Sequence, residues 1–325
     1  MEKDKYDYSL YQKLKNDDGK IIEFFILSEN LFGYYTIIGI INILSIKKKI
    51  EYVLRISDYN KSDLKVISLE KNSNELAIIN NKTIEIIEIK NTNENYSYIS
   101  KGIIVKIENF TINCLTKLKD IPFFCYATGS NEIFINHSIS PYEKITFFEI
   151  NSQLNKLNLN TFQIMTLASI KKKIFIGNID GFLIYSFDDK FNFKFEKFFP
   201  EFYLANPYFF MIISSNKVIL SGKYYMALIN SDTLQIEIKF SDPGYKIRGL
   251  FITLDDKMLF APCTDESFRI FDLNTFKEVK KYEKKHDNSI GIYFKISNFL
   301  IFSQSQYINK NLDKDEYLYC YKNNC

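Results

Sequence analysis

The sequence contains no tryptophan, two histidines and three arginines among its 325 residues, and both glycine (11) and proline (6) are scarce. With only His137 and His286, a histidine-rich metal centre is excluded. Phosphate loops of the GxxxxGK[ST] or GxGxxG kind and a GxSxG nucleophile elbow are also absent. We therefore expect no enzyme, no cofactor and no metal site.

Paired cysteines are missing as well. The five cysteines are odd in number, widely spaced and form no CxxC motif. The first residues are charged, and no apolar segment of the signal-peptide type follows them. These features predict a reduced, intracellular protein with free thiols.

An excess of one charge sign is lacking too. Lys and Arg number 42 against 39 Asp and Glu, which gives a net charge of +3. This balance does not favour direct nucleic-acid binding. Because lysine is abundant and arginine rare, a single lysine carries little functional information, whereas each arginine is a stronger signal.

One long run has no charge at all, from Leu31 to Ile46. A membrane-spanning helix needs about 20 apolar residues. The run is shorter, rich in β-branched residues and interrupted by Gly33, Gly39 and Asn42. Two buried strands joined by a tight turn are the favoured interpretation, and a membrane anchor is the alternative.

Short β-rich segments separated by polar turns recur along the whole chain. Residues 247–285 give the clearest unit, with strands predicted over 247–254, 258–264, 268–273 and 276–282. Four strands joined by tight turns in about 40 residues are typical of one propeller blade. A pair of β-sandwiches is the alternative use of such repeats.

The predicted third strands are regularly spaced except at one place. We place their ends at Ile46, Ile89, Ile150, Phe187, Ile229, Leu273 and Tyr321. The interval of 61 residues before Ile150 predicts an insertion within 103–145. The predicted blades are about 21–57, 62–102, 103–160, 162–200, 203–242, 247–285 and 288–325.

The last blade lacks a fourth strand, and residues 1–20 can supply it. Tyr6, Tyr8, Leu10 and Leu14 alternate with polar residues, as in a half-buried strand. A strand taken from the opposite end of the chain removes an open sheet edge. The predicted fold is therefore all-β, a single domain over 1–325: a seven-bladed WD40-like β-propeller whose ring an N-terminal strand closes.

Three residues are candidates for partner binding. His286 opens the last blade, where a histidine bonded to Asp265 in a neighbouring turn would rigidify the structure. Arg248 begins a first strand, where its planar guanidinium suits a partner carboxylate. A salt bridge to an acidic loop is the alternative for Arg248, and a Cys263–His286 nucleophile pair is the least favoured alternative for His286.

Three stretches resemble the WD40 propellers of the mitotic checkpoint, of the budding-uninhibited-by-benzimidazole type, and their mRNA-export siblings. They are 289–321 with its polar insertion before the last strand, 164–185, and 8–25 with its acidic turn. The chain departs from that family in having no arginine around 205–208 and no tryptophan in 33–39.

The resemblance implies a non-enzymatic scaffold that binds short peptide motifs on a propeller rim. Such a scaffold is a monomeric subunit of a nuclear, kinetochore or cytoplasmic assembly. A nuclear-pore or mRNA-export adaptor is the first alternative. A phosphoinositide-binding propeller at membranes is the second, although no two arginines here are adjacent.

Overall fold

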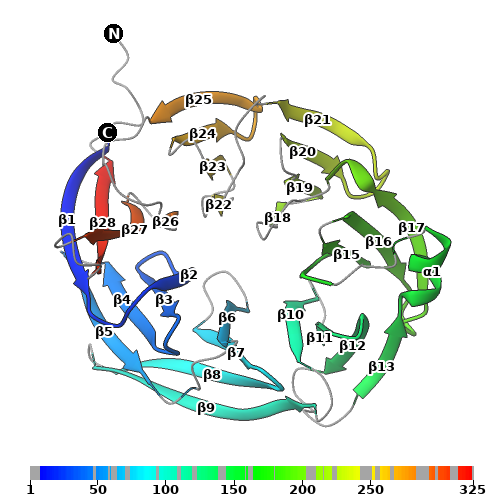
Figure 1. Ribbon diagram of the computed structural model, residues 1–325, viewed down its shortest axis with the longest axis horizontal. Helices are drawn as coiled ribbons and strands as arrows, with labels where there is room; N and C mark the ends of the chain where they lie inside the picture. Colours follow the sequence, from blue (N-terminus) through cyan, green and yellow to red (C-terminus); the bar gives the residue numbers. More distant parts are fainter. Residues whose placement is uncertain are drawn as a thin grey trace. The chain divides into compact units, whose positions relative to one another are not determined.

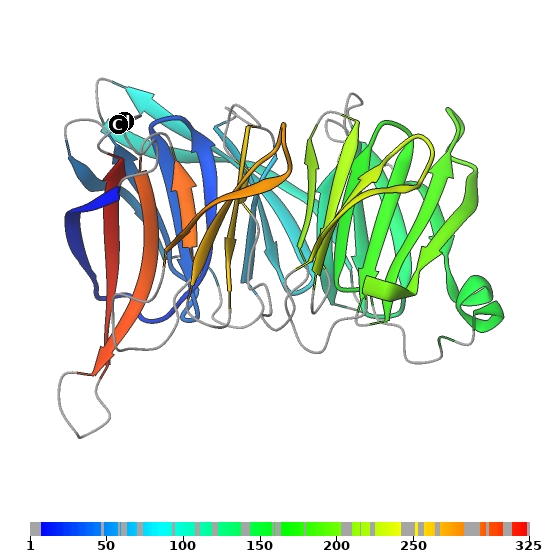
Figure 2. The same cartoon turned by 90° about the horizontal axis from the view of Figure 1, so that it is seen from above.

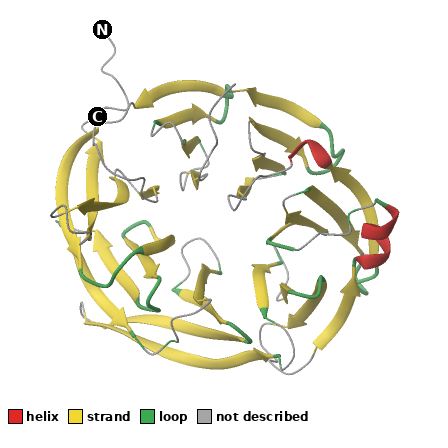
Figure 3. Ribbon diagram, viewed as in Figure 1, coloured by secondary structure: helices red, strands yellow, loops and turns green. Residues whose placement is uncertain are grey.

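The computed structural model describes residues 8–46, 49–57, 59, 64–69, 74–92, 95–107, 111–118, 123–137, 144–157, 159, 164–178, 180–202, 210–214, 216–221, 225–241, 251–252, 257–263, 267–282, 293–296, 299–307 and 314–323. These residues form seven four-stranded sheets, with helix only at α1 (Asn151–Lys156) and η1 (Pro200–Phe202) (Figure 3). The all-β prediction is confirmed. The chain divides into unit 1 (1–80, 85–102 and 251–325) and unit 2 (81–84 and 103–250).

Unit 1 contains four of the sheets, and in three of them the strands are consecutive in the sequence. The first sheet is β2 (Ile21–Ser28), β3 (Leu31–Thr36), β4 (Ile41–Ile46) and β5 (Ile50–Ile56). The second is β6 (Leu64–Ser68), β7 (Glu75–Asn80), β8 (Thr83–Thr92) and β9 (Asn95–Lys106), so β9 runs past the predicted boundary at 102. The third is β22 (Phe251–Ile252), β23 (Met258–Pro262), β24 (Phe268–Asp272) and β25 (Lys277–Tyr282).

The fourth sheet of unit 1 joins the two ends of the sequence. It consists of β26 (Tyr293–Ile296), β27 (Phe299–Tyr307), β28 (Lys314–Asn323) and β1 (Tyr8–Asn16). β1 pairs with β28 in antiparallel register, and the two strands lie side by side in Figure 1. The prediction that the N-terminal segment supplies the missing strand is confirmed.

The charge-free run forms two buried strands, as predicted. β3 and β4 have every residue buried, because the sheet is covered on both faces. Phe32 and Leu44 face one apolar cluster with Leu318 of β28, whereas Leu31 and Ile43 face another with residues of β6–β8. A strand buried on both faces has a continuous apolar sequence rather than an alternating one. Within the part of the chain that the structure describes, no helix is long and apolar enough to span a membrane.

Unit 2 contains three sheets of consecutive strands. They are β10 (Ile112–Lys117), β11 (Phe123–Thr128), β12 (Glu132–His137) and β13 (Lys144–Glu149); β14 (Thr166–Ile170), β15 (Lys173–Asn178), β16 (Gly181–Phe187) and β17 (Phe193–Phe199); and β18 (Phe210–Ser214), β19 (Lys217–Ser221), β20 (Tyr225–Asn230) and β21 (Ile236–Ser241).

The strand assignment of the first of these sheets was wrong. Glu149 ends the fourth strand, β13, and the third strand is β12, which ends at His137. Phe148 to Ile150 therefore do not end a third strand. The third strands β8, β12 and β16 end at Thr92, His137 and Phe187, which makes their spacing 45 and 50 residues.

The extra residues lie after β13, not within 103–145. They include α1, whose Leu154 is buried in the apolar cluster of this unit beside Ile150. Figure 2 shows α1 beyond the ends of the neighbouring strands. A six-residue helix is too short for sequence periodicity to reveal, so the sequence did not predict α1.

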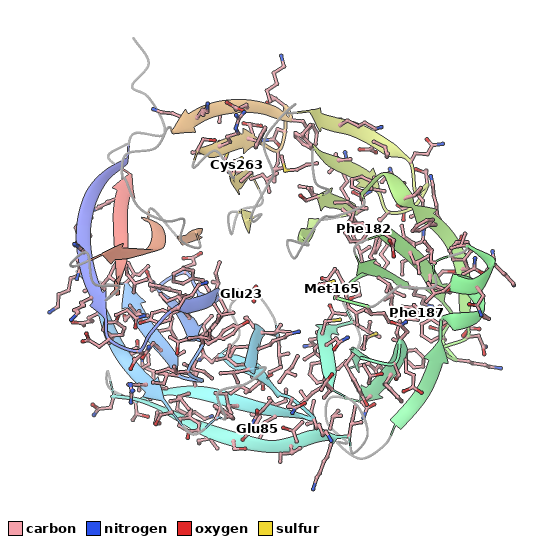
Figure 4. All side chains as sticks on the ribbon, in the orientation of Figure 1. Glu23, Glu85, Met165, Phe182, Phe187 and Cys263 are labelled. Carbon is pink, nitrogen blue, oxygen red and sulfur yellow. The ribbon has the colours of Figure 1, made fainter. Side chains whose placement is uncertain are left out.

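β16 shows how the sheets of unit 2 pack. Phe182 and Ile184 join the cluster shared with β18–β21, whereas Leu183 and Phe187 join the cluster shared with β10–β13. Figure 4 shows Phe182 and Phe187 among the densely packed side chains of this unit. The period-two alternation of a strand is thus used to bury both faces.

The turn after the third strand recurs in three sheets. Asp188, Asn230 and Asp272 are 42 residues apart, immediately after β16 or at the ends of β20 and β24. A side-chain oxygen of each accepts two backbone N–H bonds of 2.8–3.1 Å from residues two to four positions later. Such Asx turns fix the chain reversal between the third and fourth strands of these three sheets.

Lysines of a preceding sheet hold the turn over 230–235. Lys171 Nζ lies 2.7 and 2.9 Å from the two carboxylate oxygens of Asp232, and Lys197 Nζ donates to the Leu234 carbonyl at 2.7 Å. About half of the Lys171 and Asp232 side chains is exposed. The sheets β14–β17 and β18–β21 are therefore fastened at their margin by solvent-exposed charge contacts.

Candidate interaction surface

The three partner-binding residues predicted from the sequence, Arg248, Asp265 and His286, lie outside the described residues. Their assignment stays a prediction. Cys263 is described: it is buried, and its Sγ donates to the Ala261 carbonyl at 3.4 Å. Among the described residues, no group of three or more His, Cys, Asp or Glu side chains is placed to hold a metal ion.

Two arginines are described: Arg269 pairs with Glu278 at 2.8 Å, and Arg55 belongs to a larger hydrogen-bond network. Arg55 lies near the end of β5, opposite Asn42 of β4, and faces the loop that joins β1 to β2. We call Asn16, Asp18, Tyr34, Asn42, Tyr52 and Arg55 the Asp18 network. Sequence reasoning singled out the rarity of arginine but did not select Arg55.

The loop between β1 and β2 is shaped by Asn16. Its Oδ1 accepts the Asp18 backbone N–H at 3.2 Å and the Tyr34 hydroxyl at 2.9 Å, and its Nδ2 donates to the Gly19 carbonyl at 2.6 Å. Gly19 has a φ of 83°, a left-handed conformation that glycine adopts without strain. Asn16 is buried, so this small turn is a fixed part of the sheet margin.

Asp18 is the charged centre of the network. Arg55 Nε lies 3.1 and 3.2 Å from the two carboxylate oxygens, Arg55 Nη2 lies 2.8 Å from Oδ1, and Asn42 Nδ2 donates to Oδ2 at 2.9 Å. Burial alone would raise the pKa of Asp18, but the bonds from Arg55 and Asn42 and the charge of Arg55 outweigh it and lower that pKa. Arg55 keeps an exposed side chain, and its Nη1 has no acceptor among the described residues.

Two tyrosines extend the network, Tyr34 in the core and Tyr52 at the surface. The hydroxyls of Tyr34 and Tyr52 lie 3.0 Å apart, and the Tyr52 hydroxyl also donates to the Lys15 carbonyl at 3.3 Å. Burial is the main reason that the pKa of Tyr34 is raised and that the pKa of Tyr52 is raised to about 12. Both hydroxyls stay neutral at physiological pH and fix the position of β1 against β3 and β5.

β1 has a further side-chain attachment to this sheet. The amide of Gln12 donates from Nε2 to the Ile50 carbonyl at 2.8 Å and accepts the Ile50 N–H on Oε1 at 3.0 Å. A side-chain amide here reproduces the pair of bonds that two strands exchange. The register of β1 shifts between Leu10 and Gln12, where Tyr11 bulges outward and is exposed.

The turn between β3 and β4 lies next to the Asp18 network and is apolar. Its apex is Ile37 and Ile38, which are 54% and 37% exposed, and we call it the isoleucine turn. The Gly39 N–H donates to the Thr36 carbonyl at 3.0 Å, and the Ile37 N–H donates to the Lys20 carbonyl at 2.9 Å. A Cβ added at Gly19 would lie 3.8 Å from Ile38 Cγ2, so Ile38 lies over the loop that carries Asp18.

Searches against known proteins compared the whole chain. No family model matches it. A 73-residue stretch is 34% identical to a WD repeat domain-containing protein 83 homolog from Dictyostelium discoideum; the match covers 22% of this chain and about a fifth of that relative. The WD40 β-propeller domain of Doa1 superposes with a TM-score of 0.66 over 98% of this chain and 97% of that domain, at 10% identity.

The fold is of the WD40 β-propeller type. The superposition spans nearly all of both chains, and the local match is to a WD-repeat protein, so both agree with the class predicted from the repeats. Neither comparison distinguishes a mitotic-checkpoint propeller from an mRNA-export propeller within this WD40-type class.

Proposed function

We propose that this chain is a non-enzymatic protein-interaction scaffold that binds short peptide motifs of partner proteins. The observation that carries the proposal is the WD40-type fold, which spans nearly the whole chain. Proteins of this architecture present the loops and strand ends of their sheets as binding surfaces. Affinity would come from apolar anchor residues together with a few charge-assisted hydrogen bonds.

In this proposal the seven sheets are the blades of one closed ring. The pairing of β1 with β28 supports closure, because it completes the last sheet with a strand from the other end of the sequence. The whole chain is then a single domain and a monomeric subunit of a larger complex. Direct nucleic-acid and membrane binding are not part of the proposed function.

The finer assignment is to a mitotic-checkpoint or kinetochore scaffold in the nucleus or cytoplasm. Its support is the sequence resemblance over 8–25, 164–185 and 289–321. Arg248, Asp265 and His286 are its proposed partner-binding residues. A nuclear-pore or mRNA-export adaptor is the alternative that the same resemblance carries.

The test is affinity purification of the tagged chain from dividing cells, with mass spectrometry of the captured proteins and an unrelated tagged propeller as control. Checkpoint kinases or kinetochore scaffolds would support the leading assignment, and pore or export factors would support the alternative. Capture of only trafficking, ribosomal or autophagy proteins would reject both. Flotation with phosphoinositide-containing liposomes would instead identify a lipid-binding propeller.

A further inference from the structure

The isoleucine turn is not a requirement of the fold. The corresponding turns between the second and third strands are polar in two other sheets: Asn81 and Lys82 join β7 to β8, and residues 129–131 (Gly-Ser-Asn) join β11 to β12. Gly, Asn, Asp and Ser dominate turns because they hydrogen-bond locally or adopt positive φ, and isoleucine does neither. Two exposed isoleucines at this apex break a local rule without benefit to the turn itself, which is typical of a functional site.

A third exposed isoleucine lies close by on β2. Ile21 pairs with Thr36 and Glu23 with Tyr35, so Ile22 is the extra residue of a bulge and is 38% exposed. It is two residues from Lys20, whose carbonyl binds the isoleucine turn. Bulges re-aim a side chain that the regular alternation would have turned inward. The apolar surface thus continues from the turn onto the start of β2.

Cations border this apolar surface. Lys20 is exposed, and no described residue forms an ion pair with it. Arg55 donates from Nε and Nη2 to Asp18, and its Nη1 has no acceptor among the described residues. The carboxylates nearby have partners: Asp18 is bonded by Arg55, Asp17 lies 3.1 Å from Lys15 Nζ, and Glu23 accepts from the Tyr35 hydroxyl at 3.1 Å. The donors left over therefore favour an incoming carboxylate.

The surface is also held in place before any partner arrives. Tyr34 and Asn16 are buried and hydrogen-bonded beneath the loop that Ile38 covers, and Asn42 is anchored to Asp18. A site that is already ordered loses less conformational entropy on binding.

We propose that Ile22, Ile37 and Ile38, with Lys20 and Arg55, form a docking surface for a short segment of a partner protein that carries an apolar side chain near a carboxylate. The apolar side chain covers the isoleucines, and the carboxylate accepts from Lys20 and from Arg55 Nη1. This inference rests on the proposed scaffold function and adds to it a place on the fold and a chemistry for the bound peptide.

The first test is selection of random dodecapeptides displayed on phage against the full chain, with counter-selection on the Ile37→Asn/Ile38→Asn variant. That variant makes the turn polar, as in the two other sheets. We expect enriched peptides with an aliphatic or aromatic residue within a few positions of Asp or Glu. Peptides without this pairing would overturn the proposal.

The second test is fluorescence anisotropy with a labelled, enriched peptide. We expect Ile37→Asn/Ile38→Asn to raise the Kd of the peptide by about tenfold or more. Lys20→Glu should raise this Kd by about threefold or more, and the difference from the unmodified chain should shrink at high salt. The matched control is Ile99→Asn/Ile103→Asn, because these β9 isoleucines are as exposed, at 52% and 46%, and lie elsewhere. Equal Kd values for all variants would overturn the proposal.

Other occupants have their own readouts. Self-association of the unmodified chain in sedimentation that Ile37→Asn/Ile38→Asn abolishes would identify a second copy and overturn the peptide proposal. If the unmodified chain floats with phosphatidylserine vesicles and the same variant does not, the occupant is a membrane and the peptide proposal is overturned. If the affinity purification recovers the same partners with this variant, the docking surface is refuted but the scaffold function stands. If the unmodified chain captures no partner, the scaffold function itself fails.

Discussion

Two places show how one sheet is fastened to the next, and they use different chemistry. In unit 1, β1 is held against β2–β5 by a network of two tyrosines, asparagine side chains and one aspartate–arginine pair, in which the Tyr34–Asn16 bond is fully buried. In unit 2, the turn over 230–235 is held against β14–β17 by the Lys171–Asp232 pair, whose side chains are about half exposed, and by a part-buried bond from Lys197. Both contacts join a connecting segment to a neighbouring sheet, but only the first contains a fully buried side-chain hydrogen bond.

The difference follows from the origin of the segments. The turn over 230–235 belongs to a 42-residue pattern, so its shape is built by Asn230 and the lysines only supplement packed apolar faces. β1 comes from the opposite end of the sequence and has no hairpin partner to fix its position. Specific side chains must therefore set its register against β2–β5. A repeat supplies its own geometry, whereas a strand from outside the repeat needs individual contacts.

Removal of β1 should have the largest effect on the stability of the protein. We expect deletion of residues 1–16 to lower the melting temperature by at least about 10 °C, because β28 then has an open edge and the buried network loses Asn16. Deletion of residues 1–7 is the matched control, because it keeps β1 whole. Thermal denaturation followed by circular dichroism measures both, and an unchanged melting temperature without β1 would contradict the expectation.

The next effect concerns the buried hydroxyl of Tyr34. We expect Tyr34→Phe to reduce the free energy of unfolding by about 1–2 kcal/mol, because bonds to Asn16 and Tyr52 are lost in a buried site. Tyr126→Phe in unit 2 is the control, since the Tyr126 hydroxyl makes no hydrogen bond with a described residue. Urea denaturation compares the two, and equal losses would show that the network contributes nothing specific.

A pH titration sharpens the role of Asp18. Because its folded-state pKa is lowered, its stabilisation is fully present above the unfolded pKa, about 3.9, and is lost as the pH falls through the folded value. We expect Asp18→Asn to cost about 1–2 kcal/mol at pH 7 and progressively less below about pH 4. Urea denaturation at pH 7, 5, 4 and 3 measures this difference. A constant difference over that range would rule out the ionic role.

The smallest effect is expected for the exposed pair of unit 2. Lys171→Met should leave the urea midpoint nearly unchanged, because both partners are half exposed and screened by salt. Urea denaturation of Lys171→Met, Asp232→Asn and the double variant gives the coupling energy. A coupling as large as the loss measured for Tyr34→Phe would mean that the two contacts are equally strong.

Sequence periodicity captured most of the fold because each strand carries its own apolar signal. The hairpin from Leu31 to Ile46 and the pairing of the N-terminal strand both followed from local pattern. The assignment failed between 132 and 165, where a short helix and a link follow β13, and a strand ending at Ile150 was counted as the third instead of the fourth. When two adjacent strands are both apolar, the sequence alone does not show which is the third strand of the sheet and which is the fourth.

The candidate surface was harder to predict. Gln12 and Asn16 hydrogen-bond to backbone groups of Ile50 and Gly19, and neither residue type indicates such a role in a sequence. Ile37 and Ile38 belong to the charge-free run, so the same signal that predicted buried strands did not reveal two exposed residues at their turn. Arg248, Asp265 and His286 lie outside the described residues and stay predictions.

The pairing of β1 with β28 has a consequence for the synthesis of the chain. β1 ends at Asn16, and its partner strand begins at Lys314. At about 5–20 residues per second, a ribosome delivers the partner roughly 15 s or more after β1 has emerged. Contacts that close so long a loop form late, so β1 stays without its partner strand until β28 has been made. Newly made chains should therefore depend on chaperones most during this interval, and least once β1 has paired with β28.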